Sequence, residues 1–254
     1  MPLLRVSDLT VSFDGVVALE QASFDVEEGQ VCGLIGPNGA GKTTLFNCIS
    51  RIYQPTSGAI EFDGKSVLSV PSHRISALGV ARTFQNLGLF DSQTVLQNVL
   101  VGAHHRMRAN FLTSVLRLPG VRREERALRD EGMALLVDLG LESHAHQPVG
   151  GLPFGTLKRV EIARALASRP RLMMMDEPAS GLTHAEVDDV GELLLRIRAS
   201  FGLTLLLVEH HMSLVMGVSD KAVVLDFGRK IAEGPPSAVQ QDPAVIEAYL
   251  GSSV

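Results

Sequence analysis

The stretch that decides the fold class is Gly36-Pro37-Asn38-Gly39-Ala40-Gly41-Lys42-Thr43. It fits the pattern G-x-x-x-x-G-K-[S/T] of a phosphate-binding loop. The apolar residues 31–35 precede it and a helical pattern over residues 41–50 follows, which is the context that this loop requires. Glycines permit backbone angles that a β-carbon forbids, so successive N–H groups can turn inward on a phosphate. The dipole of the following helix adds positive potential at the same place.

Three polar side chains close this loop, and each has an expected role. Lys42 is expected to reach the β- and γ-phosphates of a nucleotide, and the Thr43 hydroxyl to bind Mg²⁺. Thr44 can donate to the α-phosphate. The alternative, a glycine turn with a chance lysine, leaves the flanking strand and helix unexplained.

A phosphate-binding loop needs a second carboxylate for its metal ion. An apolar strand over residues 171–175 ends at Asp176 and Glu177, and ligands in such sheets bind outside the carboxyl ends of the strands. We expect Asp176 to hold Mg²⁺ directly or through water, and Glu177 to polarise the attacking water. Alternatively, the Asp-Glu-Pro sequence only caps the next segment. No guanine-binding Asn-Lys-x-Asp or Thr-Lys-x-Asp motif occurs, which argues against a GTPase.

Composition narrows the class of protein further. The chain has 254 residues, 45% apolar and 20% charged, with a net charge of −5. This composition is typical of one large globular domain or a core with a lobe, and the acidic balance argues against a nucleic-acid partner. No run approaches the roughly 20 apolar residues of a membrane span, and residues 1–10 do not form a secretory signal. With only Cys32 and Cys48 present, we expect a protein of the reducing cytosol.

Periodicity gives a coarse map of the chain. The first third is rich in strands, and the middle contains two helical patterns, residues 94–108 and 122–139. The last third alternates between helices and short apolar strands, which predicts a mostly parallel sheet with helices on both faces. Besides residues 171–175, the predicted elements there are helices at residues 156–168 and 184–200 and strands at residues 204–208 and 222–225.

Residues 151–166 lie between the two motifs and contain Gly-Leu-Pro-Phe-Gly-Thr-Leu-Lys-Arg. With this turn, the chain resembles the ATP-binding-cassette (ABC) ATPases, whose hallmark is a Leu-Ser-Gly-Gly-Gln turn at the start of a helix. The resemblance covers nearly the whole chain, with its motifs in the family's order. It implies an α/β fold: a P-loop NTPase (RecA-like) core with a mostly parallel sheet, an N-terminal antiparallel β subdomain and an α-helical subdomain. The core would comprise residues 1–85 and 161–254, and the helical subdomain about residues 86–160.

The resemblance also implies roles for single residues. Phe13 falls where the family stacks an aromatic ring on adenine, although a strand phenylalanine can equally be core. Gln85 matches the glutamine that senses the γ-phosphate and Mg²⁺ and hinges the helical subdomain. His210 matches the switch histidine, with His211 beside it. In the family, the residues at these positions bind ATP and Mg²⁺ together with the carboxylates, the phosphate-binding loop and the signature turn. The resemblance therefore implies a loop of Gly36, Pro37, Asn38, Gly39, Ala40, Gly41, Lys42, Thr43 and Thr44, and a turn of Leu152, Pro153, Phe154, Gly155 and Thr156.

Three positions depart from the family's pattern. Pro153 replaces the serine of the signature turn and Thr156 replaces its glutamine. Proline has neither a hydroxyl nor an N–H group, but the helix start at Gly155 still offers backbone N–H groups to an anion. We therefore expect a working turn with one contact fewer. Thr183 stands where aspartate is common in a loop that crosses to the partner subunit.

A finer resemblance connects the chain to the ATPases of branched-chain amino acid importers. It rests on residues 152–155, 209–216, 225–234 and 248–251 and on the longer helical subdomain. This resemblance implies a second cassette as partner, homo- or heteromeric and head to tail, transmembrane permease subunits, and indirectly a periplasmic or extracellular solute-binding protein. It implies a peripheral location on the cytoplasmic face of the inner membrane, with residues 86–105, including Leu89 and Phe90, docking on the permease.

Other functions stay open at this point. Urea and short-amide importers belong to the same subfamily. A soluble cassette acting on ribosomes or DNA is a rival, although such proteins usually carry two cassettes or a long coiled-coil insertion. A nucleotide-binding regulator that does not hydrolyse is another, and the combination of Lys42, Asp176, Glu177 and His210 argues against it.

Overall fold

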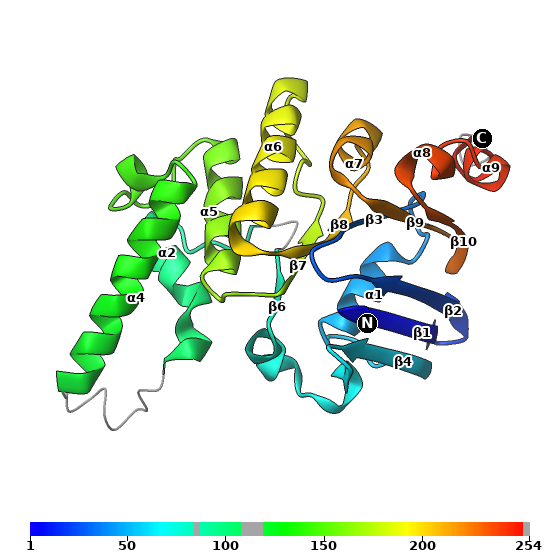
Figure 1. Ribbon diagram of the computed structural model, residues 1–254, viewed down its shortest axis with the longest axis horizontal. Coiled ribbons are helices and arrows are strands. Elements are labelled where there is room, and N and C mark those ends of the chain that lie inside the picture. Colours follow the sequence, from blue (N-terminus) through cyan, green and yellow to red (C-terminus); the bar gives the residue numbers. More distant parts are fainter. Residues whose placement is uncertain (84–86, 108–118, 251–254) are drawn as a thin grey trace. The chain divides into compact units, whose positions relative to one another are not determined.

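The computed structural model describes residues 1–83, 87–107 and 119–250 (Figure 1). The chain forms two compact units, one of Met1–Arg82 with Arg171–Val254 and one of Thr83–Pro170. The second boundary expected from the sequence, at residue 160, falls inside a helix that belongs wholly to the second unit. Within the described residues, the helices are too short or too polar to cross a membrane.

The first unit begins with an antiparallel sheet in the order β2-β1-β4-β5. Asp14 and Gly15 form a two-residue turn with both φ angles positive, a geometry that matches the twist of a hairpin. This turn lets the second strand start directly after it, at Val16. The strands are β1 (Leu4–Phe13), β2 (Val16–Val26), β4 (Ser57–Phe62) and β5 (Lys65–Ser66).

A six-stranded sheet in the order β10-β9-β3-β8-β7-β6 completes this unit. Its strands pair in parallel except for β9 with β10, which confirms the predicted mostly parallel sheet. Every residue of β3, β7 and β8 is buried, as expected for strands covered on both faces. The strands are β3 (Val31–Ile35), β6 (Val80–Arg82), β7 (Leu172–Asp176), β8 (Thr204–Val208), β9 (Lys221–Asp226) and β10 (Arg229–Gly234).

Helices cover both faces of this sheet. On one face, Leu34 and Val223 join a hydrophobic core with Phe46 of α1 and with the antiparallel sheet. On the other, Ile35 and Val224 join a second core formed with the C-terminal helices. The helices of the unit are α1 (Lys42–Ile49), α6 (His184–Phe201), α7 (Met212–Val218), α8 (Pro236–Val239) and α9 (Pro243–Leu250), with short 3₁₀ turns η1 (Val67–Ser69), η2 (Ser72–Arg74) and η3 (Ser76–Leu78).

The second unit is helical. α2 starts at a capping box between Thr94 and Gln97. It ends at Gly102, where a β-carbon would lie 1.8 Å from the carbonyl oxygen of Arg164, so only glycine permits this close approach of two helices. Its elements are α2 (Val95–Gly102), η4 (His104–Arg106), α4 (Pro119–Asp138), η5 (Glu142–His144) and α5 (Phe154–Leu166).

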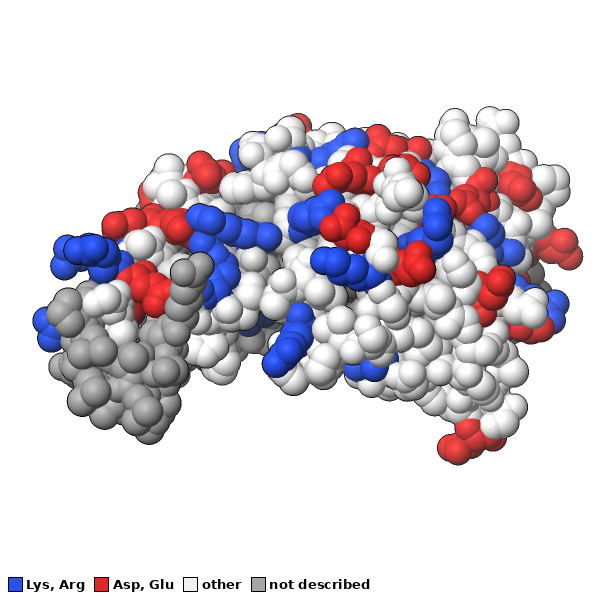
Figure 2. Space-filling model, turned by 60° about the horizontal axis from the view of Figure 1, so that its bottom comes forward, with Lys and Arg blue, Asp and Glu red and all other residues white. Residues whose placement is uncertain are grey.

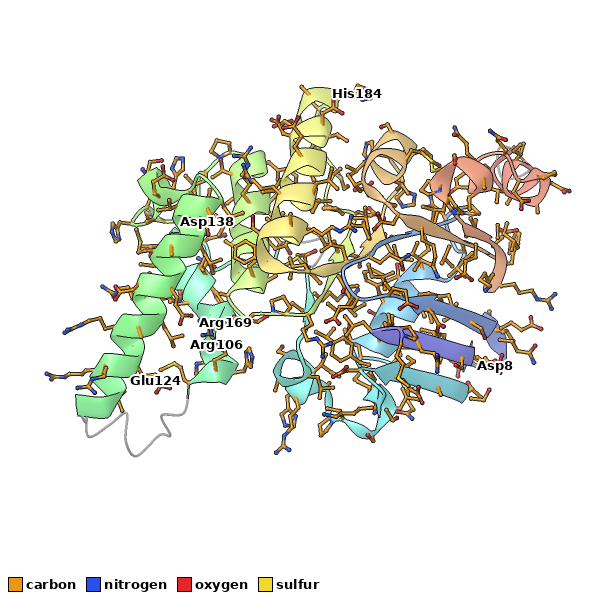
Figure 3. The ribbon with its side chains drawn as sticks, viewed as in Figure 1. Asp8, Arg106, Glu124, Asp138, Arg169 and His184 are labelled. Atoms are coloured by element: carbon orange, nitrogen blue, oxygen red, sulfur yellow. The ribbon has the colours of Figure 1, made fainter. Side chains whose placement is uncertain are left out.

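Ion pairs tie this helical unit together at one end. Arg106 and Arg169, labelled in Figure 3, each donate to a different oxygen of Glu131 at 2.8 Å. Glu131 lies on α4, so the carboxylate links α4 to the segments that follow α2 and α5.

On the face that Figure 2 shows, basic and acidic side chains are interspersed rather than separated by sign.

Candidate nucleotide site

The loop between β3 and α1 depends on glycine at two places. Gly36 has a φ of 149°, and a β-carbon there would lie 2.1 Å from the carbonyl oxygen of Leu225. Gly41 has a φ of 99°, and its β-carbon would lie 2.7 Å from the carbonyl oxygen of Ala18. Any other residue would clash with backbone and adopt an unfavourable conformation. The loop therefore wraps as the motif requires, against strands from distant parts of the chain.

Lys42 lies inside this loop rather than outside it. Its Nζ donates to the carbonyl oxygens of Gly36 at 2.6 Å and Pro37 at 2.9 Å, and the side chain is buried. Burial lowers the pKa of Lys42, while the nearby charges of Glu177 and Asp176 act in the opposite direction. The ammonium group is thus held at the loop, near two carboxylates.

A cavity of about 200 Å³ lies over the loop. Residues 38–44 form its floor, and Ala18, Glu177 and His210 complete its lining. No side chain of the described residues caps the first turn of α1, and that turn contains no acidic residue. The N–H groups at this helix start can therefore face an anion, which the helix dipole also favours.

Glu177 and His210 meet at the edge of this cavity. The carboxylate oxygen Oε1 of Glu177 lies 2.8 Å from Nε2 of His210. Glu177 has a φ of 52°, a region that residues with a β-carbon seldom adopt, and it follows the last residue of β7 directly. The two side chains expected to act on the terminal phosphate are thus brought together, one after β7 and one after β8.

Asp176 is engaged by a residue that the sequence analysis did not single out. Arg82, at the end of β6, donates from Nη2 to Oδ2 of Asp176 at 2.9 Å. It also donates to Asn47 and Ser50, and its guanidinium lies 5.4 Å from the ring centre of Phe46. The sequence did not reveal this contact, because it depends on the parallel pairing of β6 with β7. A basic residue at the end of a short strand was the available clue.

A second unforeseen residue is Glu209, which precedes the histidine. Its side chain is 1% exposed. Oε1 accepts from the N–H of Ala179 at 2.7 Å, and Oε2 accepts from the N–H of His210 at 2.9 Å and of His211 at 3.1 Å. Nδ1 of His211 also lies 3.1 Å from Oε2. An acid directly after a buried strand was the available clue.

The structure also tests whether Mg²⁺ suits the residues expected to hold it. Thr43 lines the cavity, and Asp176, whose charge acts on Lys42, offers one further oxygen ligand in the same unit. The described residues contain no group of three His, Cys, Asp or Glu side chains that could hold a metal ion. A single hydroxyl and a single carboxylate fit Mg²⁺, which keeps several waters and binds phosphate oxygens. They do not fit an ion that needs many protein ligands.

Phe13 lies at the end of β1, next to the hairpin turn. Its ring contacts that of Tyr53 edge-on, with 5.1 Å between the centres, and the side chain is 41% exposed. An exposed aromatic pair of this kind leaves a ring face available for stacking. The adenine contact stays a prediction.

The turn at residues 152–156 belongs to the helical unit. Helix α5 begins at Phe154, two residues earlier than the sequence pattern indicated, with Pro153 at its N-cap position. No side chain of the described residues caps this end, and Gly155 and Thr156 lie in the first turn. The Nζ of Lys158 lies 5.5 Å from the ring centre of Phe154. This end of α5 therefore offers backbone N–H groups and a positive dipole without a serine hydroxyl.

Gln85 lies outside the described residues, so its role stays a prediction. At residues 87 and 88, where the description resumes, Arg164 of α5 donates to the carbonyl oxygens of Gly88 at 2.5 Å and Leu87 at 2.6 Å.

Thr183 forms a capping box with Glu186 at the start of α6. The threonine that replaces the family's aspartate therefore has a structural role.

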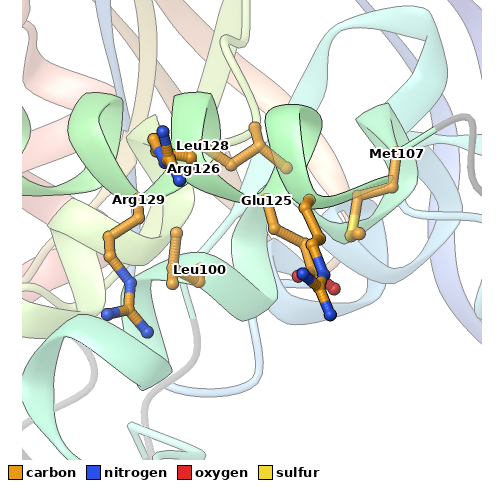
Figure 4. Close-up of a pocket in the computed structure, with 7 residues that line it drawn as sticks. Leu100, Met107, Glu125, Arg126, Leu128 and Arg129 are labelled. Atoms are coloured by element: carbon orange, nitrogen blue, oxygen red, sulfur yellow. The ribbon is translucent and has the colours of Figure 1, made fainter. Parts of the chain in front are cut away.

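A second cavity, of about 380 Å³, lies between α2 and α4 (Figure 4). Leu100, Met107 and Leu128 provide apolar surface, and three arginines and Glu125 surround it. Residues 122, 125, 126 and 129 are exposed. This cavity is therefore an open depression of a solvated helix face, as the mixed charges of this segment indicate.

Comparisons with known proteins agree with this picture. Residues 19–180 match the family described as "ABC transporter", and residues 229–254 match "Branched-chain amino acid ATP-binding cassette transporter". The chain is 44% identical over 252 residues to the high-affinity branched-chain amino acid transport ATP-binding protein BraF of Pseudomonas aeruginosa. This match covers 99% of each chain. It is 39% identical over 252 residues to the corresponding protein LivG of Salmonella typhimurium, again covering 99% of both.

Among solved structures, a nucleotide-free ATP-binding cassette from an ABC transporter superposes with a TM-score of 0.84. It is 31% identical, and the match covers 98% of this chain and 99% of the other. A phosphate-binding loop after β3 and a carboxylate pair at the end of β7 define a nucleotide-hydrolysing α/β protein. The chain belongs to the ABC transporter family and is an ATPase of that family.

Proposed function

We propose that this ATPase powers the import of branched-chain amino acids through a transmembrane permease. The observation that supports this function best is the match of residues 229–254 to a family specific to branched-chain amino acid cassettes. The relatives BraF and LivG, matched over nearly their full length, are named as high-affinity branched-chain amino acid transport ATP-binding proteins. Import of urea or short amides by the same machinery is the alternative, since a shared fold and ATPase site do not specify the solute.

In the proposed cycle, the phosphate groups of ATP lie on the loop of residues 36–44. Lys42 would exchange its two carbonyl partners for oxygens of the β- and γ-phosphates, gaining charge-assisted hydrogen bonds. Thr43 and Asp176, with Gln85, would hold Mg²⁺. When bound, that ion neutralises charge that develops on the phosphate oxygens.

Hydrolysis would depend on the pair formed by Glu177 and His210. Glu177 orients the attacking water and accepts its proton, and His210 stabilises the charge on the γ-phosphate. The 2.8 Å contact between the two side chains supports this division of work, because one group can fix the other.

Two such chains, or this chain and a similar one, would form a head-to-tail dimer. Each nucleotide would lie between one chain's loop and the partner's turn at residues 152–156, whose uncapped helix start suits the γ-phosphate. ATP would then bind the closed dimer better than the open one, and its hydrolysis would release the dimer. The movement would reach the permease through residues 86–105, where Phe90 is 49% exposed.

The proposed location is the cytoplasmic face of the cell membrane, reached through the permease. A solute-binding protein on the opposite side would deliver the substrate. The test is purification from membranes with bound permease subunits, followed by ATPase assays of the complex in vesicles with its binding protein. Leucine, isoleucine and valine are expected to stimulate hydrolysis. Stimulation by urea or acetamide alone would overturn the proposed solute class.

A further inference from the structure

Glu209 is a buried acid at the point where two functional segments meet. Within the described residues, four N–H groups surround its carboxylate: those of the main chain at Ala179, His210 and His211, and the ring Nδ1 of His211. A buried carboxylate costs folding free energy unless donors satisfy it, so this arrangement fixes the position of every donor.

The two oxygens of this carboxylate face different segments. Oε1 binds the loop after Glu177, at Ala179, whereas Oε2 binds the turn that carries His210. Ala179 is fully buried and lies only two residues from Glu177. One side chain therefore connects the main chain beside Glu177 with the main chain of His210.

The connection has a direct consequence for the reacting groups. His210 is an exposed side chain, and within the described residues its ring makes one hydrogen bond that the structure gives, from Nε2 to Glu177. An exposed imidazole reaches such a partner only when its main chain directs the Cα–Cβ bond toward it, and the hydrogen bond then offsets the loss of side-chain rotamer freedom. The Glu209 carboxylate supplies that restraint at the N–H group of His210 itself.

We propose that Glu209 is a positioning residue for ATP hydrolysis. It holds the His210 imidazole on Glu177 and couples it to the loop at residues 179–183. This inference rests on the proposed function, in which Glu177 and His210 act on the terminal phosphate of ATP.

The simpler role is structural, since His211 is the N-cap residue of α7 and Glu209 stabilises the turn before it. A double-mutant cycle separates the two roles. Turnover of Mg-ATP is measured for the full-length protein, for Glu209→Gln, for His210→Ala and for the double variant, with the nucleotide dissociation constant measured alongside. In Glu209→Gln, an NH₂ group replaces one carboxylate oxygen and therefore faces N–H donors. The remaining oxygen can accept hydrogen bonds from only one of the two segments.

We expect Glu209→Gln to lower kcat by about 100-fold, as for a misplaced reacting group, with the nucleotide dissociation constant changed less than about threefold. In the His210→Ala background, the same substitution should lower the residual rate by less than about threefold, because its target is gone. Equal factors in both backgrounds, or a matching loss of nucleotide binding, would overturn the proposal. Glu192→Gln, an exposed acid of α6, is the matched control.

Two additions keep the test decisive. Glu209→Asp retains the charge but shortens the side chain by one methylene, so the cycle can be repeated if the glutamine variant does not fold. Amide hydrogen exchange of the full-length protein without nucleotide gives a readout independent of activity. Residues 179 and 210 should lose protection together in Glu209→Gln, and unchanged protection at either would contradict the link. If the wild type fails to hydrolyse ATP, the proposed function fails while the exchange result still decides this connection.

Discussion

Arg82 donates from Nη2 to Oδ2 of Asp176 at 2.9 Å, and both side chains are about nine-tenths buried. The arginine reaches this carboxylate from the end of β6, while its Nη1 donates to Asn47 of α1 and to Ser50, the C-cap residue of that helix. Arg82 thus connects three parts of the molecule: β6, to which it belongs, helix α1, and Asp176, the carboxylate that is expected to bind Mg²⁺.

Removing Arg82 should therefore destabilise the fold strongly. Arg82→Met leaves Asp176 buried without its counter-charge, and we expect a loss of about 3–5 kcal/mol in the free energy of unfolding. Arg5→Met is the control, because its pair with Asp25 is nearly half exposed and is worth less than about 1 kcal/mol. Urea unfolding followed by circular dichroism measures both. Equal losses in the two variants would contradict the role given to burial.

Lys42→Ala should weaken nucleotide binding. The lysine is expected to make charge-assisted hydrogen bonds to phosphate, each worth about 1.5–3 kcal/mol, so the dissociation constant for Mg-ATP should rise about 10- to 100-fold. Turnover should fall with it. Lys65→Ala removes an exposed lysine of β5 and should leave binding unchanged. Isothermal titration calorimetry provides the comparison, and similar affinities in both variants would refute the assignment.

Pro153→Ser tests the departure of the signature turn from the family's pattern. In the structure the start of α5 offers main-chain N–H groups without help from the residue at position 153. The substitution should therefore leave the hydrolysis rate unchanged or raise it. Pro243→Ser, at the exposed start of α9, controls for the loss of a proline. A large fall in rate for Pro153→Ser alone would mean that the ring shapes the turn.

The two cysteines predict a loss of stability at high pH. Burial raises the pKa of Cys32 from 9.0 to about 12 and that of Cys48 from 9.0 to about 11. The unfolded chain releases these protons first, so the stabilisation is complete below pH 9 and is lost as pH rises through the folded-state values. Between pH 9 and 11 the loss approaches about 1.4 kcal/mol per pH unit for each thiol.

The measurement is the free energy of unfolding in urea at pH 9, 10 and 11. A variant with Cys32→Ala and Cys48→Ala should show a flatter slope than the wild type, whatever its stability at pH 7. Parallel slopes would show that other groups cause the alkaline loss.

Features encoded by local sequence were predictable. The glycines and lysine of residues 36–43 specify their own loop, and the apolar run before Asp176 specifies a buried strand that places the carboxylates at its end. The parallel sheet followed from the alternation of elements. The resemblance to ABC ATPases was confirmed by the family match and by the solved cassette structures.

Features that depend on tertiary contacts were not predictable. β6 has only three residues, too few for a periodic signal, and it exists because it pairs with β7. The contact of Arg82 with Asp176 follows from that pairing. The contacts of Glu209 could not be predicted from its position alone. One donor, the N–H of Ala179, lies 30 positions earlier in the chain, and another is the N–H of the adjacent His210. The first half of β2, with Val16 70% exposed, lacks the alternation of a half-buried strand.

The central claim is that Glu177 activates water to cleave ATP bound on the phosphate loop. The most direct measurement is phosphate release from saturating Mg-ATP by the purified Glu177→Gln chain, with Glu192→Gln as control. The account predicts retained ATP binding and a rate about 10²–10⁴-fold below wild type, the range for loss of a general base. A rate near that of the wild type would contradict it.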